Sequence, residues 1–179
     1  MATPAADDWR ELAAISPLLA ALPRGARAKS RRISVPRASA LFRSGDRPAA
    51  MHFVLSGEIR LLRYSKSGGE TVLQRARRGF LAEASLDQGA YHCDAVAVAA
   101  SEVLAIPLRA FEEALAAAAF QRAWVRHLAR ELRRARAQVE RLSLKTARDR
   151  IVHFIETEGD GGAVSLMQFK KDWAAELGL

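Results

Sequence analysis

The sequence predicts an α+β fold, in which an antiparallel β-roll is followed by a long helix. Two observations carry this prediction. Short apolar runs separated by turn residues recur from Ile33 to Ile106, a spacing typical of an antiparallel barrel or jelly roll. From Leu108 to Arg150 the chain then has neither glycine nor proline and is rich in strong helix formers, so a helical region follows the strands.

Within that helical region one apolar stripe repeats with heptad spacing. Its members are Val125, Leu128, Leu132, Ala135, Val139 and Leu142. This is the pattern of a helix that packs against a partner helix, and in a parallel pair Glu131 and Arg136 would meet with opposite charge. We therefore predict a parallel homodimer along residues 125–142. An amphipathic helix lying on its own domain is the alternative.

The remaining elements follow from periodicity and turn signals. Residues 8–22 read as a helix with a break at Ser16-Pro17, ended by Pro23 and Gly25. Residues 108–119 read as a short helix that includes the alanine run 116–119, and residues 151–155 lie on a later helix that closes at the glycine loop 159–162. Residues 163–165 suit a short strand, and residues 169–177 a last helix ended by Gly178. The expected strands contain the runs Ile33–Val35, Leu41–Phe42, Met51–Leu55, Ile59–Leu62, Val72–Leu73, Phe80–Leu81, Val96–Val98 and Val103–Ile106.

Composition limits the class of protein. A chain of 179 residues can hold one sizeable core and a smaller appended unit. No apolar run approaches the ~20 residues that span a bilayer, and the first residues lack the features of a secretory signal. The single cysteine, Cys93, excludes an intrachain disulfide and a cysteine-rich metal site. We expect a cytoplasmic protein that does not associate with membranes.

The net charge of +8 is concentrated in two blocks. Arg122 to Arg150 holds ten basic and three acidic residues, and Arg24 to Arg43 holds seven basic and no acidic residues. Such blocks suit a polyanion, and DNA is the usual one. For the block from Arg24 to Arg43, an ordinary solvated surface is an equally good interpretation.

Three stretches resemble the cyclic AMP receptor and fumarate–nitrate regulator family of bacterial transcription factors. Leu41–Asp46 and Met51–Ile59 resemble its first barrel strands and glycine turns, Gly79–Leu86 its phosphate-binding cassette, and Trp173–Leu179 the first helix and turn of a helix-turn-helix. The resemblance covers about residues 15–179 and implies three parts. These are a cyclic-nucleotide-binding-like sensor β-roll (residues 1–112), a dimerisation helix (113–145) and an incomplete winged-helix domain (146–179).

The cassette departs from that of the cyclic-nucleotide binders in the family. Those proteins have a glycine before the glutamate and an Arg-Ser pair that holds the phosphate, whereas this chain has Ala82 and Cys93-Asp94. A thiol and a carboxylate lack the bidentate grip of arginine on a phosphate. We therefore expect an effector other than cyclic AMP, with Glu83 capping its own short turn. The pocket candidates are Glu83, Ala84, Ser85, Cys93, Asp94 and Arg136.

The run Tyr91-His92-Cys93-Asp94 leaves three interpretations open. On a strand, Tyr91 and Cys93 would face one way and His92 and Asp94 the other. Cys93 is then a small buried apolar residue beside an exposed His92, a redox-sensing thiol, or, with His92, a haem ligand. Apart from that haem alternative, we expect no cofactor and no metal.

Leu179 falls at the turn of the helix-turn-helix, where the recognition helix would begin, so we expect the natural protein to continue. In it, Lys170, Lys171 and Arg148 would contact the DNA backbone. The sequence thus predicts a homodimeric transcription regulator rather than an enzyme. Its expected partners are DNA, an unknown small effector and RNA polymerase. The alternative is a sensor or interaction module that does not read DNA.

Overall fold

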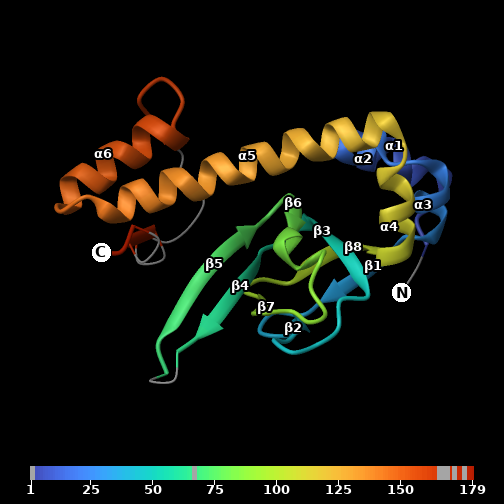
Figure 1. Cartoon of the computed structure of the whole chain (residues 1–179), viewed down its shortest axis with the longest axis horizontal. Coiled ribbons are helices and arrows are strands. Elements are labelled where there is room, and N and C mark those ends of the chain that lie inside the picture. Colours follow the sequence, from blue (N-terminus) through green and yellow to red (C-terminus); the bar gives the residue numbers. More distant parts are fainter. Residues whose placement is uncertain (1–2, 66–67, 165–169, 171–172, 175–176) are drawn as a thin grey trace. The chain divides into compact units, whose positions relative to one another are not determined.

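The computed structural model describes residues 3–65, 68–164, 170, 173–174 and 177–179 (Figure 1). It divides into two compact units, Met1–Trp124 and Val125–Leu179. The helices are α1 (Ala6–Ile15), α2 (Pro17–Ala21), α3 (Arg24–Lys29), α4 (Leu108–Leu115), α5 (Ala118–Ser143) and α6 (Ala147–Glu158), with the short 3₁₀ helix η1 (Glu83–Ser85). The strands are β1 (Arg31–Val35), β2 (Ala40–Phe42), β3 (Ala50–Ser56), β4 (Ile59–Tyr64), β5 (Glu70–Ala76), β6 (Gly79–Leu81), β7 (Asp94–Ala97) and β8 (Ser101–Pro107).

The first unit is built on two antiparallel sheets, which confirms the predicted α+β fold with a β-roll. One sheet has the order β1-β8-β3-β6 and the other β2-β7-β4-β5. Each expected apolar run falls on one of these strands, except that Val98 lies just beyond the end of β7. Gly57, at the turn between β3 and β4, has a φ of +80°, and a Cβ there would collide with Ser101. The expected glycine turn is therefore required by both the backbone and the packing.

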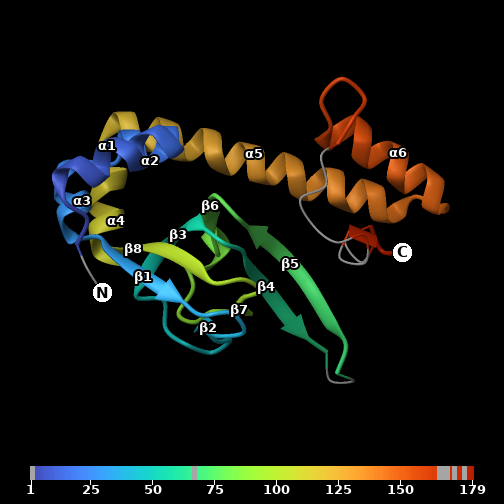
Figure 2. The same ribbon diagram turned by 180° about the vertical axis from the view of Figure 1, so that it is seen from behind.

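Strand β3 is covered on both faces, which explains its continuous apolar run. Met51, Phe53 and Leu55 pack in a core that includes residues of α1 to α4, while Val54 packs in the core formed largely by the second sheet. Side chains alternate along a strand, so one strand serves both cores. Figures 1 and 2 show α1 to α4 gathered at one end of the roll.

The N-terminal helices confirm the break and add a helix that we did not expect. Ser16 ends α1 and caps α2, because its Oγ accepts a hydrogen bond from the Leu18 N–H at 3.2 Å. Helix α2 ends at Ala21, just before Pro23 as predicted, but the unexpected helix α3 then begins at Arg24 and includes Gly25. Its Ala26 is buried in the core, and Arg27 donates from Nε to the Leu22 carbonyl at 2.6 Å. Tertiary contacts therefore outweigh the weak local helix propensity of Gly25.

The basic block from Arg24 to Arg43 is largely engaged within the first unit. Arg27 also lies over the Trp9 ring at 5.4 Å, and Lys29 pairs with Glu113 at 2.9 Å. Arg32 lies 3.9 Å from Asp8 and 3.9 Å from Glu102. These basic residues therefore have partners within their own unit, and binding of this block to a polyanion stays a prediction.

The alanine run does not form the continuous helix that its composition predicts. Helix α4 ends at Leu115, and α5 begins at Ala118. The break lets Phe111 of α4 meet Phe120 and Trp124 of α5, with ring centroids 5.5 Å and 4.9 Å apart. Alanine is the best helix former, but the free energy gained by keeping two alanines helical is small, and burying aromatic rings in edge-to-face contact outweighs it. Trp124 also meets Phe80 of β6 at 5.2 Å.

The second unit is organised by two arginines. Arg141 of α5 is buried, donates to Thr157 Oγ1 of α6 at 3.0 Å and lies over the Phe154 ring at 4.7 Å. Arg150 donates to the carbonyls of Leu144 at 2.9 Å and of Gly178 at 2.7 Å. These guanidinium groups fix α6 against α5 and against the end of the chain.

The expected C-terminal elements are only partly described. Lys170, Trp173 and Ala174 are helical, and Gly178 has a φ of +67°. The Leu179 N–H donates to the Ala174 carbonyl at 2.9 Å, the expected glycine cap of a helix. The short strand predicted at residues 163–165 is an isolated bridge from Asp160 to Ala163, and residue 165 lies outside the described part of the chain.

His52 gives the first unit a pH-dependent stability. Burial lowers the pKa of His52 to about 4, and its ring lies 5.8 Å from that of Phe42. As the pH falls below 6.5, His52 becomes protonated in the unfolded chain, whereas in the folded chain it becomes protonated only near pH 4. We therefore expect His52 to cost roughly 3 kcal/mol of unfolding free energy between pH 7 and pH 4. Urea denaturation at several pH values measures this, and His52→Leu should flatten the dependence. An equal loss in that variant would contradict the assignment.

Candidate effector site

The cassette is a tight turn between β6 and η1. Ala82 adopts the left-handed conformation, with φ 62° and ψ 30°, at the position where the resemblance expects glycine. The Ser85 N–H donates to the Ala82 carbonyl at 2.9 Å, and the Leu86 N–H to the Glu83 carbonyl at 3.2 Å. A left-handed alanine is strained, so neighbouring contacts must hold it in place.

Gln74 of β5 supplies those contacts. Its Oε1 accepts from the Ala82 N–H at 3.1 Å, and its Nε2 donates to the Phe80 carbonyl at 3.3 Å and to Glu83 Oε2 at 3.1 Å. Our sequence analysis did not single out this residue. The available signal was a polar residue two positions before the buried Ala76, and hence on the same face of the strand.

Cys93 and His92 lie on opposite sides of the chain, as the alternation predicts. Cys93 is 1% exposed and belongs to the core between the sheets, whereas His92 is exposed. Burial raises the pKa of the Cys93 thiol, although Arg63 acts in the opposite direction. The buried Ser85 places its Oγ 3.4 Å from His92 Nδ1. A thiol with a raised pKa forms little thiolate at neutral pH.

Asp94 is held by the loop after β2. Its Oδ1 accepts from the Ser44 N–H at 2.7 Å, and its Oδ2 lies 3.6 Å from Arg43 Nη1. The Gly45 N–H donates to the Tyr91 carbonyl nearby at 2.8 Å. Asp94 therefore anchors the glycine turn that the resemblance identified.

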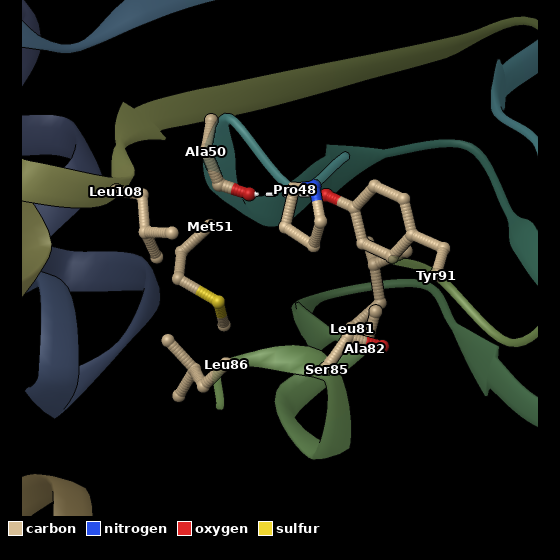
Figure 3. A pocket seen from close by; sticks show the side chains of 9 residues that line it. All are labelled: Pro48, Ala50, Met51, Leu81, Ala82, Ser85, Leu86, Tyr91 and Leu108. Carbon is tan, nitrogen blue, oxygen red and sulfur yellow. Dashed lines mark hydrogen bonds between the residues drawn. The ribbon is translucent and has the colours of Figure 1, made fainter. Parts of the chain in front are cut away.

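An apolar hollow lies beside the cassette (Figure 3). Met51, Leu81, Leu86 and Tyr91 are among its lining residues, and it has no interior space for a water molecule. The Tyr91 ring stacks on Phe42 with centroids 3.6 Å apart, and its hydroxyl donates to the Ala50 carbonyl at 3.3 Å. Burial raises the pKa of Tyr91 to about 12.

The structure brings together some of the expected pocket residues and not others. Glu83 and Ser85 lie in η1 with Ala84, whose side chain is exposed. Cys93 is buried behind the exposed His92, and Asp94 is held by the loop after β2. Arg136 is an exposed residue of the second unit. Among the described residues, no group of three or more potential metal ligands is present.

The apolar stripe of α5 is exposed within the chain. Val125, Leu128, Leu132, Val139 and Leu142 have exposed fractions between 40% and 66%, and Ala135 is exposed as well. Glu131 is bonded within its own helix, because Arg134 Nη1 donates to it at 2.6 Å. The expected pairing of Glu131 with a partner's Arg136 therefore competes with a local ion pair.

Two of the three expected DNA-backbone residues are described. Arg148, in the first turn of α6, and Lys170 are exposed, whereas Lys171 lies outside the described residues. The Thr146 side chain caps α6 by accepting from the Asp149 N–H at 3.1 Å. No described helix is long and apolar enough to cross a lipid bilayer.

Comparison with known proteins assigns the first unit. The family model of the cyclic nucleotide-binding domain matches residues 32–118, and the cyclic AMP receptor protein of Thermus thermophilus is 35% identical over 125 residues. The chain carries a cyclic nucleotide-binding domain like those of the cyclic AMP receptor and fumarate–nitrate regulator family. The matched residues make up 66% of this chain and 56% of the Thermus protein, so the chain spans little more than half of that relative.

Solved structures agree with this cyclic nucleotide-binding domain. The Thermus thermophilus catabolite activator protein is 27% identical, with a TM-score of 0.59 over 91% of this chain and 80% of that one. A putative cyclic nucleotide binding protein from Ruegeria pomeroyi is 25% identical, with a TM-score of 0.62 over 98% and 83%. The cassette of residues 79–86 lies within the matched domain.

Proposed function

We propose that this chain is the sensor and dimerisation part of a homodimeric transcription regulator. The observation that carries the proposal is the exposed heptad stripe on α5, which follows directly on a cyclic nucleotide-binding domain. A two-helix seam needs these apolar side chains at the surface of one chain. The relatives named above are receptors and activators, which favours a regulator over an enzyme.

We further propose that cyclic AMP is not the effector. Cys93 and Asp94 stand where the family's nucleotide binders have Arg-Ser, and Asp94 is already bonded to Ser44 and near Arg43. Glu83 accepts a hydrogen bond from Gln74, and the neighbouring hollow has no interior space for a water molecule. The Cys93 thiol in place of the arginine lacks its grip on a phosphate, and the carboxylate of Asp94 beside it repels the anion.

The Cys93 alternatives receive less support. Burial raises the pKa of the thiol, which lowers the fraction of reactive thiolate. His92 is exposed while Cys93 is buried, so their side chains do not converge on one ligand. We therefore propose that Cys93 fills the core and that the effector is a small molecule without phosphate.

The DNA contact is testable through its salt dependence. Binding to a generic duplex should weaken as salt rises, and the double variant R148A/K170A should lower the slope of log K against log salt by about 2. Fluorescence anisotropy measures this slope. The control R24A/R109A removes two exposed charges from the first unit and should change the slope little. Equal slopes for the two double variants, or no binding at all, would favour the interaction module that does not read DNA.

A further inference from the structure

Gln74 makes three contacts that fix the orientation of its side-chain amide. The Ala82 N–H can only donate, and the Phe80 carbonyl can only accept. Gln74 Oε1 must therefore face Ala82 and Nε2 must face Phe80, at 3.1 Å and 3.3 Å. In this orientation Nε2 also reaches Glu83 Oε2 at 3.1 Å. Neither a carboxylate nor an apolar side chain can make this set of bonds.

These contacts engage polar groups of the cassette, which is part of the candidate effector site. The family resemblance gives Glu83 the part of holding a ligand hydroxyl, and the Ala82 N–H lies in the same turn. We propose that Gln74 is an intramolecular occupant of the effector site, and that an effector must displace its amide. This inference rests on the proposed sensor function of the cassette. The displacing group must itself donate to Glu83 and accept from Ala82, so a neutral amide or hydroxyl fits and a phosphate does not.

The same side chain is linked to the start of α5. Gln74 bonds the carbonyl of Phe80, and the Phe80 ring packs against Trp124 at 5.2 Å and against Phe111 at 6.0 Å. Trp124 is the residue directly before the first member of the apolar stripe, Val125. Displacement of Gln74 would therefore remove a hydrogen bond from Phe80, whose ring contacts Trp124 in the N-terminal part of α5.

The inference is tested by two substitutions of Gln74. Gln74→Ala removes an acetamide-sized group and leaves its space open, whereas Gln74→Leu fills that space without hydrogen bonds. Hydrogen exchange of residues 79–86, followed by mass spectrometry or NMR, measures how well the backbone amides of the cassette are protected. Both variants should exchange the Ala82 amide about fivefold faster than the unmodified chain, since a hydrogen bond of roughly 1 kcal/mol is lost.

Added acetamide then tests whether the Gln74 amide occupies a site that a separate ligand can fill, or only packs against the cassette. Acetamide should restore protection of the Ala82 amide in Gln74→Ala and leave Gln74→Leu unchanged. Unchanged protection in Gln74→Leu, or an equal response of both variants to acetamide, would overturn the inference. If Gln74→Ala does not fold, the exchange rate of the Ala82 amide in Gln74→Leu is compared with that in the unmodified chain, and equal rates would overturn the inference. None of these measurements depends on dimerisation or DNA, so the proposed function can fail independently.

Discussion

Replacing Leu132 by lysine should convert the proposed dimer into a monomer. Leu132 is 52% exposed in one chain and lies at the centre of the stripe. In a symmetric pair the two new ammonium groups would face each other across the seam, where like charges at 4 Å repel by about 4 kcal/mol at an effective dielectric of 20. This repulsion alone raises the dissociation constant of the dimer about a thousandfold. Light scattering across a concentration series should then give half the mass of the unmodified protein.

Leu132→Met provides the matched control for that substitution. Methionine keeps the volume and the apolar character of leucine, so the dimer mass should persist. Circular dichroism of both variants would show whether the helix is intact. A dimer mass that survives Leu132→Lys would remove the stripe from the proposed interface.

Cyclic AMP and cyclic GMP should give no heat in calorimetry up to millimolar concentration, and no shift in melting temperature. Asp94 would repel the phosphate, and Gln74 already engages Glu83. The measurement is sensitive, because a ligand at one hundred times its dissociation constant stabilises a protein by about 2.7 kcal/mol. Such a gain raises the melting temperature of a domain of this size by several degrees.

The cyclic AMP receptor protein of Thermus thermophilus is the natural positive control for that titration. A micromolar dissociation constant for the present chain would contradict the proposal and mean that another basic residue holds the phosphate. Arg136 is then the first residue to replace, because the family resemblance places it toward the ligand.

The β-roll was predictable because its strands are short, apolar and separated by strong turn signals. The same local logic gave the break at Ser16, the glycine turn at Gly57 and the cap at Gly178. It failed where tertiary packing decides. The alanine run breaks because Phe111 and Phe120 pack together, and α3 forms because Ala26 is buried and Arg27 bonds the end of α2.

The candidate site divides in the same way. The residue types at Ala82, Glu83, Cys93 and Asp94 can be read from the sequence, and with the family resemblance they predict that the arginine contact to a phosphate is missing. The role of Gln74 cannot be read in this way, because β5 reaches the cassette only when the strands pair. A residue eight positions away in the chain then bonds the Ala82 amide.

The sequence by itself determined the strands and the heptad stripe, because each depends on residue type and spacing along the chain. The family resemblance adds the expectation that the phosphate-binding arginine is replaced by Cys93. The tertiary structure decided which polar groups find partners. Asp94 bonds the loop after β2, Glu83 accepts from Gln74, and Arg141 is buried against Phe154. Hydrogen bonds and buried charges depend on distances of a few ångströms between segments that the sequence does not place side by side.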